Sequence, residues 1–317
     1  MKFDDSIMDN REKRIFALRE LYLRRGCTRY RMGKFEEYDL YARNKEFLLS
    51  EQIITFTDTN GRLMALKPDV TLSIVKSLKD APEKLAKLCY NESVYRVSKG
   101  AGGFRELMQS GVECIGAVDD RCVGETLLLA AESLALCANS YALEVTHLDI
   151  LRRFVYNVSE DAAVRQDILK CVWEKSLHGI LDVCCNAGIT GEAPEALCAL
   201  LGLHGSPAET LPKLEALCAP YGLDAELSSL RAVLSVLDGT GMEDKVRLDF
   251  SPVSNLSYYN GILFMGYVEG VPGSVLSGGQ YDKLMRRMGR RSKAVGFAVY
   301  LDMLERLGET DAERTLE

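Results

Sequence analysis

Residues 94–116 read VYRVSKGAGGFRELMQSGVECIG, and this stretch indicates how the chain folds. Two runs of alternating apolar and polar residues flank a short turn, a pattern that predicts a β-hairpin. Three glycines stand at the predicted tip: Gly100, Gly102 and Gly103. In the second strand, Gln109 and Glu113 are four positions apart, an even spacing, so their side chains project from the same face. The hairpin therefore presents a carboxylate and an amide on one side of a sheet.

Arg96 and Arg105 flank the same tip, one on each predicted strand. They could hold the negative charge of a ligand, or they could be ordinary surface partners of nearby acids, which contribute little to stability. The glycines fit a hairpin tip better than a phosphate cradle, because GAGGFRE opens no helix as a dinucleotide-binding loop does. From these residues alone, the hairpin is either a ligand site or a polar strand face.

The segments around the hairpin predict an α+β domain. Asn60-Gly61 lies between alternating runs, which is a strong signal for a second hairpin. Apolar periodicity predicts helices at residues 9–25, 69–78 and 124–140. Further strands are expected at residues 143–150, 245–270 and from 294 into a final helix, with a loop at 275–284.

Between about residues 152 and 240 the strand patterns disappear, and Leu- and Ala-rich segments alternate with turns. We therefore expect a small all-helical insertion at residues 151–244. The core would consist of residues 1–150 and 245–317, as an antiparallel sheet flanked by helices.

Composition narrows the class of protein. A net charge of −7 and a pI near 5.3 argue against a general nucleic-acid binder, because contact with phosphates needs a basic surface. The ten cysteines form no CxxC pair and the three histidines stand far apart, so we expect no metal site. The first residues contain acids and no apolar run, and we find no membrane span, so a cytoplasmic protein with reduced cysteines is expected.

Five segments, in this order, resemble the catalytic domain of class II histidyl-tRNA synthetases. They are ALKPDVT (65–71), the hairpin 94–116, SYYNGILF (257–264), SGGQYD (277–282) and AVGFAVYLDML (294–304). The resemblance covers essentially the whole chain and implies the class II synthetase-like fold with its helical insertion. The sequence ends where the synthetases' anticodon-binding domain would begin, so a chain without that domain is expected.

Four positions depart from the synthetase pattern. Ser98 replaces a glutamate that helps to hold ATP, Ser254 a catalytic arginine, and Met303 an arginine that packs against adenine. Gly33 replaces the proline of the dimer-forming motif. Loss of one preorganised donor typically lowers a rate by about 10²–10³, so we expect no adenylation, no enzyme activity and no cofactor.

The amino-acid half of the pocket is retained, and the resemblance implies that it binds histidine. Asp69, Thr71 and Gln109 would receive the α-ammonium group, and Arg96 the carboxylate. Glu113 and Tyr259 would hydrogen-bond the imidazole. Tyr258, the other residue of the double tyrosine, is expected to belong to the same histidine site. Tyr281 and the backbone of Gly279 would close the wall, and Arg105 is a possible anion contact. Because side chains alternate along a strand, one of the pair Tyr258–Tyr259 is expected to point to the opposite face as a core aromatic.

A truncated synthetase paralogue with these features is similar to the regulatory subunits of ATP phosphoribosyltransferase. The resemblance implies a self-dimer that joins a short-form catalytic subunit in a hetero-octamer and takes L-histidine as its feedback inhibitor in histidine biosynthesis. Two alternatives remain. One is a synthetase-like ligase that activates an amino acid, and the other is an RNA-binding pseudo-synthetase module.

Overall fold

The computed structural model describes residues 7–48, 53–97, 103–251 and 258–305. Its centre is a nine-stranded sheet that is mostly antiparallel, with parallel pairing only between β1 and β5 and between β7 and β9 among the described strands. In spatial order the strands are β1 (Thr28–Arg29), β5 (Ala86–Val97), β6 (Phe104–Gly116), β12 (Lys293–Tyr300), β11 (Leu276–Gln280), β10 (Asn260–Val268), β7 (Tyr141–His147), β9 (Val246–Asp249) and β8 (His204–Gly205).

The predicted hairpin of residues 94–116 is confirmed as β5 and β6, which pair antiparallel along their full length. Arg96 and Arg105 are direct cross-strand partners in it. The first strand begins earlier than its pattern indicated, at Ala86. Of the three tip glycines, Gly103 is described, with a φ of 106° that favours glycine, and Gly100 and Gly102 lie outside the described residues.

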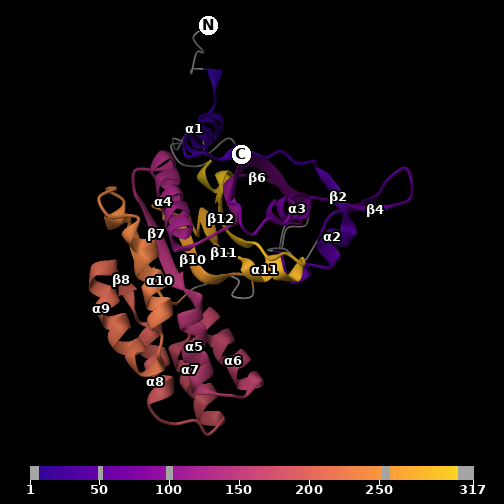
Figure 1. Cartoon of the computed structure of the whole chain (residues 1–317). Coiled ribbons are helices and arrows are strands. Elements are labelled where there is room, and N and C mark those ends of the chain that lie inside the picture. The colour runs from indigo at the N-terminus through magenta and orange to yellow at the C-terminus, as the bar shows by residue number, and fades with distance from the viewer. Residues whose placement is uncertain (1–6, 49–52, 98–102, 252–257, 306–317) are drawn as a thin grey trace.

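A smaller sheet projects from the side of the molecule (Figure 1). It consists of β2 (Phe35–Glu37), β4 (Leu63–Leu66) and β3 (Thr55–Thr57), in the order β2-β4-β3. β3 and β4 are the predicted hairpin around Asn60-Gly61. The chain then passes from β4 through Asp69 into a short helix that begins at Thr71, so this sheet leads directly to two of the predicted site residues.

Helices cover the large sheet and extend below it (Figure 1). They are α1 (Asn10–Arg24), α2 (Tyr38–Ala42), α3 (Thr71–Ser77), α4 (Asp120–Cys137), α5 (Leu148–Val158), α6 (Ala162–Trp173), α7 (Leu177–Asn186), α8 (Glu192–Leu201), α9 (Pro207–Cys218), α10 (Asp224–Ser235) and α11 (Asp282–Arg287). Short 3₁₀ turns are η2 (Lys45–Phe47), η3 (Ala219–Tyr221), η4 (Glu243–Lys245) and η5 (Leu301–Leu304).

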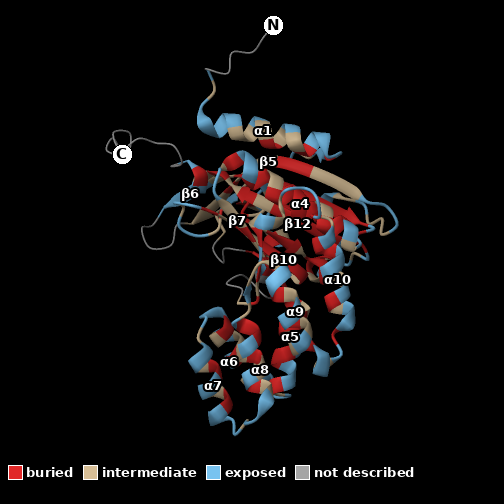
Figure 2. Cartoon of the chain, turned by 90° about the vertical axis from the view of Figure 1, so that its left-hand side faces the viewer, coloured by how far each residue is buried: buried red, intermediate tan, exposed pale blue. Residues whose placement is uncertain are grey.

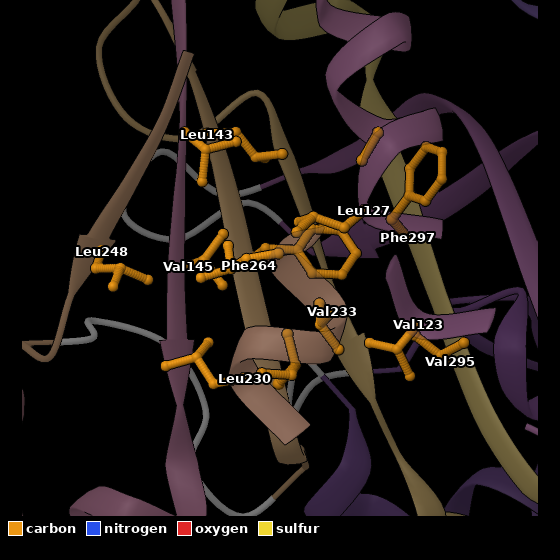
Figure 3. Packing of buried hydrophobic residues seen from close by; sticks show 14 of the residues in the cluster. Val123, Leu127, Leu143, Val145, Leu230, Val233, Leu248, Phe264, Val295 and Phe297 are labelled. Carbon is orange, nitrogen blue, oxygen red and sulfur yellow. The ribbon is translucent and has the colours of Figure 1, made fainter. Parts of the chain in front are cut away.

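One face of the sheet forms the main hydrophobic core with α4 and α10. Val123 and Leu127 of α4 and Val233 of α10 point toward Phe264 and Phe297 of the sheet (Figure 3). All five side chains are at most 3% exposed. Burial of each such side chain contributes roughly 1.5–3 kcal/mol, which makes this face a main source of stability. A second, smaller buried cluster, which includes Tyr90, Tyr258 and Tyr281, lies on the opposite face among polar side chains.

The helical region between β7 and β9 alternates buried and exposed residues along its helices (Figure 2). It is not entirely helical as expected, since the two residues of β8 pair with β9 at the sheet edge. Its last helix, α10, packs against α4, where Ser229 donates a hydrogen bond to Asp120 at 2.7 Å. The chain therefore rejoins the core sheet through main-chain and side-chain contacts.

The structure corrects two other predictions. Residues 275–284 were expected to form a loop, but they contain β11 and the start of α11. Gly278 and Gly279 obscure the strand pattern, although both are needed where neighbouring strands crowd against β11. The strand expected to run to residue 150 ends at His147, and α5 begins at Leu148. The helices expected at 9–25, 69–78 and 124–140 are confirmed within a few residues.

Candidate ligand pocket

The polar face of the sheet holds a cavity of about 480 Å³, measured to include its mouth. Four parts of the chain line it: the start of α3, the β5–β6 hairpin, the turn before β10, and the strands β11 and β12 with the residue after β11. The lining residues are Asp69, Thr71, Tyr90, Arg96, Gln109, Glu113, Tyr258, Tyr259, Ser277, Tyr281, Gly296, Phe297, Ala298 and Tyr300. Segments distant in sequence therefore meet at one site.

Glu113 is the buried carboxylate of this cavity, with 2% of its surface exposed. Thr71 donates its hydroxyl to Oε1 of Glu113 at 2.6 Å, and Tyr281 donates to Oε2 at 2.6 Å. Burial raises the pKa of Glu113 to about 8, although these two hydrogen bonds act to lower it. At neutral pH the group can therefore hold a proton or share one with a ligand.

Gly296 makes room for this carboxylate. It lies opposite Glu113 in the register between β6 and β12. A Cβ atom added at Gly296 would stand 1.8 Å from Oε2 of Glu113 and 2.6 Å from the Val112 carbonyl oxygen. No other residue type fits there without moving the strand, so glycine at this position is part of the site.

Asp69 and Arg96 supply the opposite charges of the cavity. Asp69 accepts a hydrogen bond from the Leu72 amide at 2.8 Å, which fixes its carboxylate at the start of α3. Burial raises the pKa of Asp69, and the charge of Arg96 counteracts this shift. Arg96 is half-buried and donates to the Pro68 carbonyl oxygen at 3.4 Å. A carboxylate and a guanidinium are thus available together for a zwitterion.

Aromatic rings form the remaining walls. Tyr258 and Tyr259 both line the cavity, with ring centroids 4.6 Å apart, and Tyr281 lies 6.0 Å from Tyr258. One of the double tyrosines was expected to be a core aromatic, and Tyr258 is one, 7% exposed in a buried cluster with Tyr281. It does not point to the opposite face, because both tyrosines line the cavity and precede β10, which begins at Asn260. Burial raises the pKa of each of these three phenols, so they remain neutral donors.

Asp149 and Arg152 of α5 hold the tyrosine turn from outside the cavity. Arg152 donates to the Tyr259 carbonyl oxygen at 2.7 Å and to Asp149 at 2.6 Å. The second oxygen of Asp149 accepts the Gly261 amide at 3.1 Å. One ion pair therefore binds the main chain on both sides of Asn260.

Most residues expected from the sequence are brought together. Eight of the predicted side chains line the cavity: Asp69, Thr71, Arg96, Gln109, Glu113, Tyr258, Tyr259 and Tyr281. Gly279 is not among the lining residues; it lies under the Tyr259 ring, where an added Cβ would be 2.9 Å from Cδ1. Arg105 is exposed and also does not line the cavity.

Sequence reasoning missed the lining residues Tyr90, Ser277 and Tyr300. Ser277 and Tyr300 are hydrogen-bonded to one another at 2.5 Å. Ser277 stands two residues before Gly279 and Tyr300 four after Gly296, so strand alternation could have placed both on this face. Tyr90 fills the space opposite Gly111, where an added Cβ would be 2.5 Å from its hydroxyl.

The positions that depart from the synthetase pattern are only partly described. Ser98 and Ser254 lie outside the described residues. Met303 is in η5 and 40% exposed, and Gly33 has no atom closer than 3.6 Å to an added Cβ. The described residues contain no group of three or more His, Cys, Asp or Glu side chains that could hold a metal ion. None of the helices in the described ranges is both long and apolar enough to cross a membrane.

Comparison with solved structures identifies the fold. A Bacillus halodurans protein described as an ATP phosphoribosyltransferase regulatory subunit/histidyl-tRNA synthetase superposes with a TM-score of 0.83 at 24% identity, covering 93% of this chain and 78% of that one. A chain of the ATP phosphoribosyl transferase (HisG:HisZ) complex from Thermotoga maritima gives 0.72 at 17% identity, covering 93% and 98%. The synthetase-like fold expected from the motifs is therefore confirmed.

Sequence comparison identifies the family. The histidyl-tRNA synthetase family profile matches residues 6–304. An ATP phosphoribosyltransferase regulatory subunit from Clostridium kluyveri is 29% identical over 302 residues, covering 93% of this chain and 77% of the relative. Another, from Caldanaerobacter subterraneus subsp. tengcongensis, is 32% identical over 272 residues, covering 83% and 70%. The chain belongs to the ATP phosphoribosyltransferase regulatory subunits, a family built on the histidyl-tRNA synthetase fold.

Proposed function

We propose that this chain is a non-catalytic subunit that binds L-histidine in the cavity around Glu113. Through this binding it would regulate an ATP phosphoribosyltransferase catalytic subunit, the enzyme of the first step of histidine biosynthesis. The observation that carries the proposal is the buried Glu113 carboxyl, held between two hydroxyl donors in a cavity that also contains Asp69 and Arg96. This set of groups matches the three polar parts of histidine.

The chemical match follows from the charges. The α-ammonium group would bind Asp69, Thr71 and Gln109, and the α-carboxylate would pair with Arg96. The imidazole would meet Glu113 and Tyr259. The pKa of Glu113 is about 8, and the pKa of a free imidazole is about 6.5. At neutral pH the carboxyl group and the imidazole ring would therefore hold one shared proton between them. An analogue without a ring nitrogen would leave the buried Glu113 without a ligand partner, with only the Thr71 and Tyr281 hydroxyls bonded to it, which gives specificity.

Family membership supports the partner. The relatives are named as regulatory subunits of ATP phosphoribosyltransferase, and the Thermotoga maritima structure is named as a complex. We infer a self-dimer that assembles with the catalytic subunit into a hetero-octamer. Histidine would favour the inhibited state of that assembly, and an allosteric coupling of about 1–3 kcal/mol is sufficient for such regulation.

Calorimetry of the full chain tests the binding step. L-histidine should give saturable heat, histidinol should bind roughly tenfold more weakly because it lacks the carboxylate for Arg96, and ATP should give none. Glu113→Ala should abolish histidine binding, whereas Glu106→Ala, an exposed residue on the same strand, should not. Saturable ATP binding would favour the ligase alternative instead.

A second experiment tests the regulatory step. The catalytic subunit is assayed with this chain, with and without histidine. Histidine should inhibit the complex that contains the unaltered chain or Glu106→Ala, but not the complex with Glu113→Ala. Inhibition that survives Glu113→Ala would place the effector site elsewhere.

A further inference from the structure

A second cavity lies beside the first on the polar face of the sheet. Measured together with its open mouth, it has a volume of about 270 Å³, and it lies over β7, β9 and β10. Its polar lining consists of Glu144, Thr146, Asp249, Ser251 and Tyr267. None of these residues belongs to the histidine pocket.

The strand register places the two cavities in line. Glu113, Gly296, Gly279, Leu263 and Thr146 are successive Cα partners across β6, β12, β11, β10 and β7. Directly opposed residues project from the same face of a sheet. Four strand spacings separate the ends of this row, which corresponds to about 19 Å between Glu113 and Thr146.

Thr146 is the first indication of a ligand. Its side chain is 3% exposed and lines the cavity, yet its hydroxyl oxygen has no hydrogen-bond partner among the described residues. Buried polar groups are nearly always hydrogen-bonded, and an unpaired one destabilises the folded protein. A hydroxyl left unpaired beside a cavity has its natural partner in whatever fills that cavity.

The charges indicate what the ligand is. Glu144 is half-buried, and burial together with the charge of Asp249 raises its pKa, although a hydrogen bond from Tyr267 and the neighbouring Lys175 and His204 act to lower it. Asp249 accepts hydrogen bonds from Ser251, and its second oxygen is 3.8 Å from the Lys175 ammonium group. Within the described part of the chain, Glu144 has no ion-pair partner. The cavity therefore has two carboxylates facing one half-exposed lysine.

Other basic groups nearby are engaged or distant from Glu144. His204 is the Cα partner of Asp249 and bonds through its ring to the Gly202 carbonyl oxygen. Arg247, the Cα partner of Glu144, donates to the carbonyl oxygens of Asp244 and Val246.

The remaining walls distinguish an organic cation from a metal ion. Leu263 and Met265, the Cα partners of Thr146 and Glu144, contribute apolar side chains on this face, and Tyr267 contributes a ring. Hard metal ions are bound mainly by several carboxylates in close geometry, and the described residues contain no group of three or more His, Cys, Asp or Glu side chains that could hold one. Alkylammonium groups combine a charge that needs carboxylates with a chain that needs apolar contact.

We infer that this second cavity is a binding site for a small organic amine, held through its ammonium group by Glu144, Asp249 and the Thr146 hydroxyl. The ligand's alkyl part lies against Met265 and Leu263. The site is separate from the histidine pocket and does not depend on the proposed function.

The experiment uses the full chain labelled with ¹³C at the methionine methyl groups, and Met265→Leu assigns the reporter signal. Titration with n-butylammonium should move the Met265 methyl signal saturably, while butan-1-ol and Mg²⁺ at the same concentrations should not. Glu144→Gln and Asp249→Asn should each weaken binding by roughly tenfold or more. Glu195→Gln, an exposed residue of α8 with the same charge change, should leave it unaltered.

Thr146→Val provides an independent test. It removes the hydroxyl at nearly constant shape, so the unliganded protein should be as stable as before or more stable, and n-butylammonium binding should weaken. An equal response to butan-1-ol would reduce the site to an apolar hollow, and a saturable response to Mg²⁺ would make it a metal site. Either result, or no saturable shift with n-butylammonium, overturns the inference.

Discussion

Arg152 donates its guanidinium to the Tyr259 carbonyl oxygen at 2.7 Å, so the first helix after β7 holds the wall of the proposed histidine pocket. The same guanidinium pairs with Asp149, which accepts the Gly261 amide. The position of the Tyr259 ring therefore depends on a helix that does not itself line the cavity. This relationship links the ligand to the helical region below the sheet.

Replacing Arg152 should weaken histidine binding without unfolding the chain. Arg152→Gln removes the ion pair with Asp149 and weakens the hydrogen bond to the Tyr259 carbonyl oxygen. We therefore expect histidine affinity to fall by roughly tenfold, the lower range for charge-assisted hydrogen bonds. Arg153→Gln, the exposed neighbour on α5, is the matched control. Calorimetry measures the histidine affinity of both variants. Equal affinities would show that the Arg152–Asp149 ion pair does not position Tyr259.

Glu113 should make stability fall as pH rises. Its folded pKa of about 8 lies above its ordinary value of 4.5, so between these values the unfolded chain has lost a proton that the folded chain retains. Rising pH then favours unfolding by up to about 1.4 kcal/mol per pH unit. Glu113→Gln cannot ionise and lacks this contribution.

Urea unfolding at pH 5.5 and 7.5 measures the effect. The stability difference between the two pH values should be roughly 2–3 kcal/mol more unfavourable in the unaltered chain than in Glu113→Gln. Burial also raises the pKa of Asp69, which acts in the same direction but is common to both proteins. Parallel pH profiles would show that Glu113 is ionised in the folded chain at neutral pH.

Gly296→Ala should destabilise the chain and abolish histidine binding. The added methyl would overlap Oε2 of Glu113 and the Val112 carbonyl oxygen, and the latter cannot rotate away. Overpacking of this kind typically costs about 1–3 kcal/mol. Gly33→Ala meets no atom closer than 3.6 Å and should change the free energy of unfolding by less than ~0.5 kcal/mol. Chemical denaturation compares the two.

Lys67 and Glu92 form an ion pair in which the lysine side chain is 1% exposed and the glutamate 15%. Glu92→Gln would leave a buried ammonium group unpaired and should cost about 3–5 kcal/mol. Lys67→Met fills a similar volume and should cost less, and Lys67→Met with Glu92→Gln should be more stable than Glu92→Gln alone. Thermal melts rank the three variants, and equal melting temperatures for the single variants would contradict this asymmetry.

Features with a local cause could be predicted from the sequence. The hairpin of residues 94–116 and the turn at Asn60-Gly61 follow from alternation and turn chemistry, and both are present. Glu113 and Gln109 share a strand face because their spacing is even, so the centre of the cavity was accessible from pattern alone. Asp69 and the tyrosines were predicted only from the family motifs, because no pattern in the sequence indicates that they lie near that hairpin.

Features with a distant cause could not be predicted in this way. β11 contains two glycines whose absent side chains leave no alternation to read, and only its neighbours β10 and β12 require them. Arg152 bonds to a main-chain oxygen 107 residues away, and such a contact leaves no trace in the residue types of either segment. The second cavity likewise exists only through the register that brings β9 beside β7.

The outermost strands of the large sheet, β1 and β8, are each two residues long. Exposed sheet edges offer unpaired amides and carbonyls to other chains, and long ones are sites of aggregation. At the β8 border, a copy of the protein would find a ladder of only two residues to extend. The helical region, by supplying β8, gives the sheet a protected border, and a chain without His204 and Gly205 would expose β9 to intermolecular pairing.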